Sequence, residues 1–214
     1  MVRALVGLVA VATLAAPAPA RADILVLYTD LQAGGMYGTG TGGEPAVKDQ
    51  AFFANVPNLT YGFALSARFL LFGATLQHHQ YAGPGGDGLG TWTQLMAGLD
   101  FAVDVGGNGT KNKPVKPHTS PFVHLAVKAG FGVGTGQQVD PPLSNDQIDD
   151  KAVLASAAFA VGKHLNKLFD LGVAVPVTYG YFLKNGVPAN DLSNHYQGVH
   201  VEALVFLRLR LKVL

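Results

Sequence analysis

The sequence predicts an all-β protein, an eight-stranded antiparallel up-and-down transmembrane β-barrel. The clearest sign is the last stretch, residues 199–214, where one face is apolar and the other carries most of the polar and charged side chains. A period of two is typical of a β-strand. Seven more stretches alternate in this way, and 27 Gly with only 14% charged residues suit many strands joined by Gly-rich turns. A long apolar strand avoids aggregation when both its edges are paired and its apolar face meets lipid.

The first 22 residues have the pattern of a secretory signal peptide. Arg3 provides a short basic start, an apolar run follows, and residues 20–22 read Ala-Arg-Ala, a small-x-small cleavage signal. The apolar run is too short for a spanning helix. We therefore expect residues 1–22 to be removed during export and residues 23–214 to form one barrel domain in the outer membrane of a Gram-negative bacterium.

Eight segments of the mature chain alternate between apolar and polar or small residues. Most contain roughly 10 to 13 residues, which matches the ~9–11 residues that a tilted strand needs to cross the hydrocarbon layer. Pro176 lies inside the seventh segment and cannot donate to the ladder, so we expect a bulge or a local break there. The expected strands are residues 24–36, 59–71, 72–81, 91–105, 122–134, 151–162, 169–182 and 199–214.

The links between these segments alternate in length, as they do in outer-membrane barrels, where long loops face outward and short turns face the periplasm. The second and sixth links are short, and the long links 38–57 and 135–150 are expected outside the cell. The fourth link, residues 106–117, is longer than a periplasmic turn should be. Aromatic residues near the strand ends are expected in the two girdles at the membrane surfaces: Tyr61, Phe63, Phe69, Tyr179 and Tyr181.

Charged and polar residues fall on the predicted inward faces. If the first and last strands pair with their ends level, Asp30 lies opposite Arg208, and a first loop that closes near Gly38 also brings Asp30 diagonal to Arg68. Buried charges in such an interior should be paired. We therefore hypothesise a cluster that plugs the barrel and leaves no continuous pore. Its expected members are Asp30, Arg68, Arg208 and Glu202, with further inward groups at Asp100, His124 and Lys128.

No cofactor, metal site or catalytic residue is expected. The chain has no Cys, and adjacent residues such as His78 and His79 point to opposite faces of a strand and cannot chelate one ion together. His118 and Ser120 share a face, but we find no Glu beside them to complete a triad. Loss of Arg3 and Arg21 leaves 13 Lys and Arg against 14 Asp and Glu, a balance that gives no reason to expect nucleic acid as a partner.

A signal peptide followed by eight strands that alternate in this way resembles the small eight-stranded outer-membrane barrels: the OmpA transmembrane domain, OmpX and the opacity-type surface proteins. The resemblance is one of architecture over the whole mature chain. It implies outer-membrane lipid, lipopolysaccharide and the β-barrel assembly machinery as partners. Proteins of this class usually end in an aromatic residue that the assembly machinery reads, whereas this chain ends in Leu214.

Three functions remain open at this point. The first is an envelope structural or surface-interaction protein that displays four extracellular loops to an unknown extracellular or periplasmic ligand. The second is a narrow channel or carrier for a small or apolar molecule, as in the OmpW-like barrels. The third and most distant is a lipid-modifying enzyme, such as a lipid A deacylase. An eight-stranded barrel is just wide enough for side chains or one small ligand, which excludes a general porin.

Overall fold

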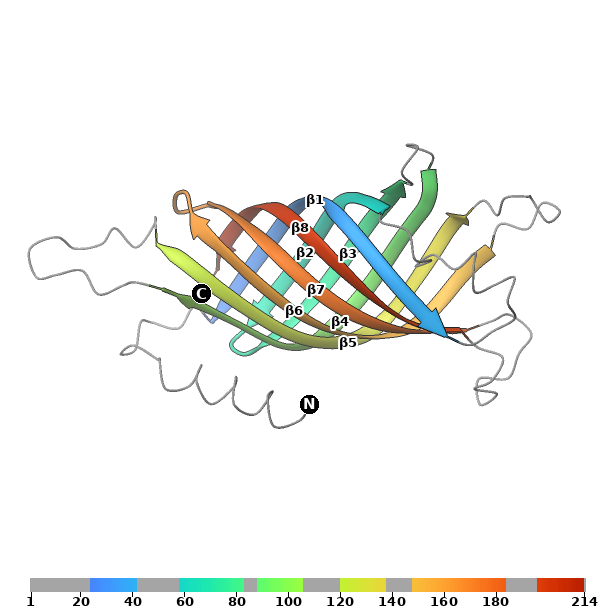
Figure 1. Ribbon diagram of the computed structural model, residues 1–214. Coiled ribbons are helices and arrows are strands. Elements are labelled where there is room, and N and C mark those ends of the chain that lie inside the picture. Colours follow the sequence, from blue (N-terminus) through green and yellow to red (C-terminus); the bar gives the residue numbers. More distant parts are fainter. Residues whose placement is uncertain are drawn as a thin grey trace, which may run out of the picture.

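The computed structural model describes residues 24–41, 58–82, 88–105, 120–137, 148–183 and 196–213. These residues form one closed antiparallel barrel in which each strand pairs with its sequence neighbours and β1 pairs with β8 (Figure 1). The predicted eight-stranded fold is therefore confirmed. The strands are β1 (Leu25–Thr41), β2 (Asn58–Phe69), β3 (Phe72–Ala82), β4 (Gly88–Asp104), β5 (Pro121–Gln137), β6 (Ile148–His164), β7 (Phe169–Leu183) and β8 (Tyr196–Lys212).

The strands are strongly staggered around the barrel. Paired residues followed once around it lead from Leu27 of β1 back to Thr39 of β1, a shift of twelve residues. The path runs through Ala67, Ala74, Ala97, Ala129, Ala155, Tyr179 and Val199. Strand tilt increases with this stagger, and at a fixed number of strands a greater tilt gives a wider barrel.

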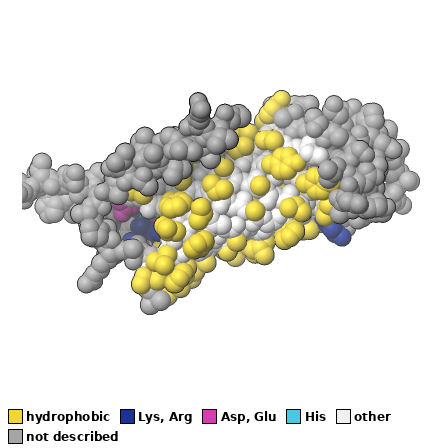
Figure 2. Space-filling model, turned by 90° about the horizontal axis from the view of Figure 1, so that it is seen from below, with side chains coloured by type: hydrophobic (Ala, Val, Ile, Leu, Met, Phe, Trp, Pro, Cys, Tyr) yellow, Lys and Arg dark blue, Asp and Glu magenta, His cyan; other side chains and the backbone are white. Residues whose placement is uncertain are grey.

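Alternation separates an apolar outer surface from a polar interior. On β1, Leu31 is 61% exposed on the outside while the neighbouring Asp30 is 3% exposed on the inside. Figure 2 shows hydrophobic side chains spread over the middle of the outer surface, with the charged side chains in view near its ends. All eight strands present exposed large apolar side chains to the outside, so the outer surface carries an apolar belt.

Several strands are longer than the sequence predicted. β1 continues past residue 36 to Thr41, where Thr39, Gly40 and Thr41 pair with the start of β8. β5 continues to Gln137 and β6 begins at Ile148. The ladder uses only backbone N–H and C=O groups, so pairing continues into Gly- and Thr-rich sequence after the apolar alternation has stopped.

The second and sixth links are short, as predicted. β2 and β3 are joined by Leu70 and Leu71, and Leu70 has a φ of 54°, a conformation that Leu rarely adopts. Neighbouring strands hold this turn, because Leu70 N donates to Ile24 O at 3.0 Å and Leu71 O accepts from Asp100 N at 2.9 Å. In the turn between β6 and β7, Asn166 Oδ1 accepts from the backbone N–H groups of Leu168 and Phe169, both at 2.8 Å.

Other parts of the sequence interpretation lie outside the described residues. These are the signal peptide at 1–22 and the interiors of the long links, at residues 42–57, 106–119, 138–147 and 184–195. Among the residues that are described, no helix is long and apolar enough to cross a membrane.

Candidate functional site

The interior of the barrel is the candidate site, because the inward side chains meet there from all eight strands. The inward side chains of β8 show how the interior changes along the barrel axis. From the end with the long links to the end with the short turns, they pass from polar to apolar to positively charged. They are His200, Glu202, Leu204, Phe206, Arg208 and Arg210, and all are buried.

Asp30 and Arg208 form a bidentate ion pair where β1 closes onto β8. They lie directly opposite each other in the ladder, as the sequence suggested. Arg208 Nε donates to Asp30 Oδ1 at 2.7 Å and Arg208 Nη2 donates to Asp30 Oδ2 at 2.8 Å. The guanidinium also lies 4.5 Å from the centre of the Tyr28 ring and 4.8 Å from that of Phe206, so its charge is compensated on several sides.

Arg68 does not reach Asp30, contrary to the sequence interpretation. The expectation closed the first loop near Gly38 and Asn58, whereas the β1–β2 ladder ends two residues earlier on β1, at Met36 opposite Asn58, so that Arg68 pairs with Val26 near the short-turn end. Ala64, four residues earlier on β2, lies opposite Asp30 instead. The Arg68 guanidinium lies 5.7 Å from the centre of the Tyr28 ring, which the Arg208 guanidinium also contacts.

Asp100, His124 and Lys128 form a second charged group. Asp100 Oδ1 lies 2.7 Å from His124 Nε2, and its Oδ2 lies 2.7 Å from Lys128 Nζ. Lys128 Nζ also donates to Thr75 Oγ1 at 2.8 Å. Gly73 makes room for this group, because a Cβ atom there would lie 2.6 Å from Asp100 Oδ2. Asp100 thus contacts both of the other residues, His124 and Lys128, that were proposed from their inward phase.

A third group at the short-turn end was missed by the sequence interpretation. His164 Nδ1 lies 2.6 Å from Asp170 Oδ1, and His164 Nε2 lies 2.9 Å from Asp104 Oδ1. Arg210 Nη2 is 3.4 Å from the same oxygen of Asp170. The signal was available for Asp170, which shares the inward phase of Gly172 and Thr178 on β7.

Glu202 belongs to a network at the opposite end and does not extend the Asp30 cluster as predicted. Leu204 and Phe206 separate it from Arg208 along β8. Its Oε1 lies 3.2 Å from His79 Nδ1 and accepts from the Tyr81 hydroxyl at 3.2 Å. His79 is buried, while its neighbour His78 faces outward and bonds Thr93 at 2.8 Å, so the two histidines point to opposite faces of β3.

Next to this network, a cluster of apolar side chains fills part of the interior. Its members are Met36, Tyr81, Trp92, Met96, Ala152, Leu154 and Phe182. The Trp92 ring lies over Gly132 and Gly134 of β5, and a Cβ atom at Gly132 would overlap it. Its Nε1 donates to Gln94 Oε1 at 3.0 Å. The alternating glycines of β5 thus provide the space for this ring.

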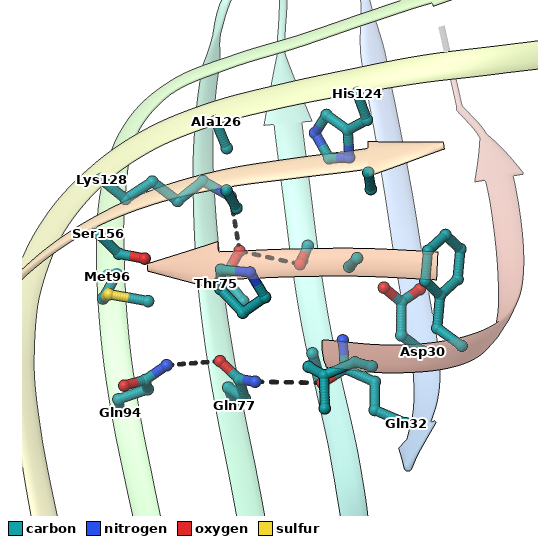
Figure 3. A pocket seen from close by; sticks show the side chains of 18 of the residues that line it. Asp30, Gln32, Thr75, Gln77, Gln94, Met96, His124, Ala126, Lys128 and Ser156 are labelled. Carbon is teal, nitrogen blue, oxygen red and sulfur yellow. Dashed lines mark hydrogen bonds between the residues drawn. The ribbon is translucent and has the colours of Figure 1, made fainter. Parts of the chain in front are cut away.

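A cavity of about 100 Å³ lies between the charged groups and the apolar cluster (Figure 3). One wall carries a row of amides, in which Gln94 Nε2 donates to Gln77 Oε1 and Gln77 Nε2 donates to Gln32 Oε1. The facing wall comes from β6, β7 and β8 and is mostly small and apolar. Its residues are Ser156, Ala158, Ala160, Ala174, Pro176, Leu204 and Phe206.

The residues proposed for the aromatic girdles all lie away from the buried interior. Tyr61, Phe63, Phe69 and Tyr179 are between 38% and 54% exposed, and Tyr181 is partly exposed. Within the described residues, no group of three or more His, Cys, Asp or Glu side chains is arranged to hold a metal ion. Ser120 is buried, and His118 lies outside the described residues.

Comparisons with known proteins find similarity only in structure. No family model matches the sequence, and no curated protein sequence matches it. Among solved structures, Neisserial surface protein A (NspA) aligns at a TM-score of 0.44 and 10% identity over 87% of this chain and 97% of that one. OprG, an outer membrane protein from Pseudomonas aeruginosa, aligns at 0.38 and 11% identity over 88% and 96% of the two chains. Ail, the attachment invasion locus protein of Yersinia pestis, aligns at 0.35 and 10% identity over 86% and 98%.

Proposed function

We propose that the protein spans an outer membrane with its interior closed, and acts as an envelope structural or surface-interaction protein through the loops at the end opposite its short turns. The apolar belt around a closed sheet supports the membrane location, because water would strongly disfavour so much exposed apolar surface. An N-terminal signal peptide at residues 1–22 is part of the same proposal and would carry the chain out of the cytoplasm.

The observation that carries the closed interior is the Asp30–Arg208 pair together with its neighbours. The bidentate pair lies beside the buried Phe206 ring on one side of the cavity, and Trp92 with Leu154 lies on the other. Both sides are occupied by buried side chains, so an ion would have to displace them to pass. Outer-membrane lipid, lipopolysaccharide and the β-barrel assembly machinery are the partners that this location implies.

Conductance in planar bilayers tests the closed interior. The refolded wild type should show no steady conductance. Arg68→Ala combined with Arg208→Ala removes two long side chains from one end of the interior, and Trp92→Ala added to this pair removes the block at the other end, so conductance should rise most when both ends are opened. Migration on a gel before and after boiling serves as the control that each protein has folded into a barrel. A large steady conductance in the wild type would refute the closed interior and favour a channel.

Cell fractionation tests the location. The mature protein should appear in the outer-membrane fraction, with a mass that corresponds to cleavage after residue 22. Recovery in the soluble periplasm would contradict the proposed location.

The central cavity favours a second candidate function, a carrier for a small molecule, because its two walls differ in polarity.

A further inference from the structure

The ladder between β7 and β8 is interrupted at Pro176. It pairs Ala174 with Leu204 and Val177 with Val201, and it skips the two residues between them on each strand. Pro176 has no N–H to donate, which explains the loss of pairing on this side. On its other side β7 stays paired, with Pro176 opposite Ala158 of β6. The local break expected from the sequence is therefore present, and it faces β8.

This gap, which we call the Pro176 seam, lies beside the central cavity. Residues of both its strands line the cavity: Ala174 and Pro176 from β7, and Leu204 and Phe206 from β8. The outer side of the seam is apolar, since Val175, Val177 and Val201 are 38%, 42% and 38% exposed. One layer of backbone with reduced hydrogen bonding thus separates the cavity from the surroundings of the barrel.

The cavity has the chemistry of a site for a small neutral amphipathic molecule. One wall carries the Gln32 and Gln77 amides, which bond each other, and the Ser66 hydroxyl, which bonds Thr75. An amide or a hydroxyl has more donors and lone pairs than one such bond uses, so these groups can also bond a ligand. The other wall is mostly apolar. The three charged residues of the lining, Asp30, Arg208 and Lys128, already have partners. A charged ligand would be buried without a counter-charge, at a high cost.

Its size limits the ligand further. The volume of about 100 Å³ is somewhat smaller than the ~150 Å³ of an engineered protein cavity that holds benzene. A short-chain alcohol is small enough for this space, whereas phenol, which is slightly larger than benzene, requires the surrounding side chains to move outward.

We propose that the central cavity binds a small neutral amphipathic molecule, which enters from the membrane by local opening of the Pro176 seam. Its hydroxyl or carbonyl would face the Gln32–Gln77 wall, and its apolar body would face β6 and β7. The entry route rests on the membrane location proposed above. Segments with fewer hydrogen bonds open most readily, which makes the seam the favoured point of entry.

The site is tested with phenol, added to the full mature protein refolded in lipid nanodiscs and followed by ligand-observed NMR. Wild type should bind phenol saturably with one site. Ala158→Leu places a larger side chain in the cavity and should abolish this binding. Ala157→Leu is the matched control, because residue 157 is the outward-facing neighbour on the same strand and its side chain is exposed; this variant should bind as wild type does.

The route is tested by closing the seam. Val177 and Val201 lie directly opposite each other and the chain has no native Cys, so Val177→Cys with Val201→Cys offers one selective cross-link beside the gap. Phenol exchange should be slower in the oxidised than in the reduced form of this variant. Pro176→Ala restores an N–H donor and should slow exchange by roughly tenfold, the effect of about one net hydrogen bond on an opening equilibrium.

The proposed binding site and the proposed entry route can be refuted separately. Absence of saturable binding in the wild type, or equal binding in Ala158→Leu, would overturn the site. Equal exchange rates in the oxidised and reduced forms would overturn the route. The gel shift on boiling and the bilayer conductance are measured on the same preparations, so a folded, non-conducting barrel that does not bind phenol counts against the site and leaves the proposed function standing.

Discussion

Arg208 and Asp30 hold the two ends of the barrel sheet together through two parallel hydrogen bonds of 2.7 and 2.8 Å. They come from β8 and β1, the last and first strands, and lie opposite each other in the ladder. Both side chains are less than a tenth exposed, and the pair therefore fixes the register of closure at a position where an unpaired charge would be costly.

Removal of one partner should destabilise the barrel strongly. We expect Arg208→Ala to lower the free energy of unfolding by roughly 3–5 kcal/mol, because Asp30 is left as a buried charge without its main partner. Urea-induced unfolding in lipid vesicles measures this. The double variant Asp30→Ala with Arg208→Ala should be less destabilised than the sum of the single variants, and strict additivity would show that the two side chains are not coupled.

The alternation of side chains predicted the faces of the strands but could predict the register only in part. Asp30 and Arg208 were placed opposite each other because both strands reach the barrel ends with little ambiguity. Arg68 was misplaced by two residues, because its register depends on where the first loop begins, and the sequence did not show that β1 leaves β2 at Met36 while it stays paired with β8 up to Thr41. A shift of two or four residues keeps a side chain on the same face and changes its partner.

The contacts across the barrel interior could also not be predicted from the sequence. Glu202 was assigned to the Asp30 cluster from its inward phase, but distance along the barrel axis depends on the stagger of all eight strands together. The twelve-residue stagger brings Glu202 of β8 to His79 and Tyr81 of β3. Such contacts across the interior join strands that are not neighbours in the sheet, so no pairwise pattern in the sequence indicates them.

A charged side chain on the outer surface should lower the free energy of unfolding by an amount that depends on its depth in the membrane. Val127 lies in the middle of β5 and is 60% exposed on the apolar belt. Val127→Arg should lower the free energy of unfolding by ~2–4 kcal/mol, whereas Val105→Arg, just past the end of β4, should cost only ~0–1 kcal/mol. Refolding titrations in lipid vesicles compare the two. Equal costs at both positions would contradict the membrane placement of the belt.

Gly132 should control the position of the single Trp. Trp92 is buried against this glycine, and a Cβ atom at residue 132 would overlap the indole ring. Gly132→Val should displace the ring, shift its fluorescence emission to longer wavelength and lower the free energy of unfolding by about 1–3 kcal/mol. Val133→Ala on the outward face of the same strand is the control and should leave the emission unchanged. An unshifted spectrum in Gly132→Val would place Trp92 elsewhere.

The last prediction concerns orientation in the membrane. The two-residue turn between β2 and β3 and the turn between β6 and β7, which contains Lys167, lie at the same end of the barrel because both follow an even-numbered strand. Outer-membrane barrels place such short turns in the periplasm, so the link between β5 and β6 should lie outside the cell. An epitope tag inserted within residues 137–144 should be labelled by antibody on intact cells.

A tag at Lys167 provides the matched control, since it lies in the four-residue turn at the opposite end. It should be labelled only after the outer membrane has been permeabilised. The gel shift on boiling shows whether each tagged protein has still folded, which separates an inaccessible tag from a failed insertion. Labelling of the Lys167 tag on intact cells, with the tag at 137–144 protected, would show that the barrel has the inverted orientation.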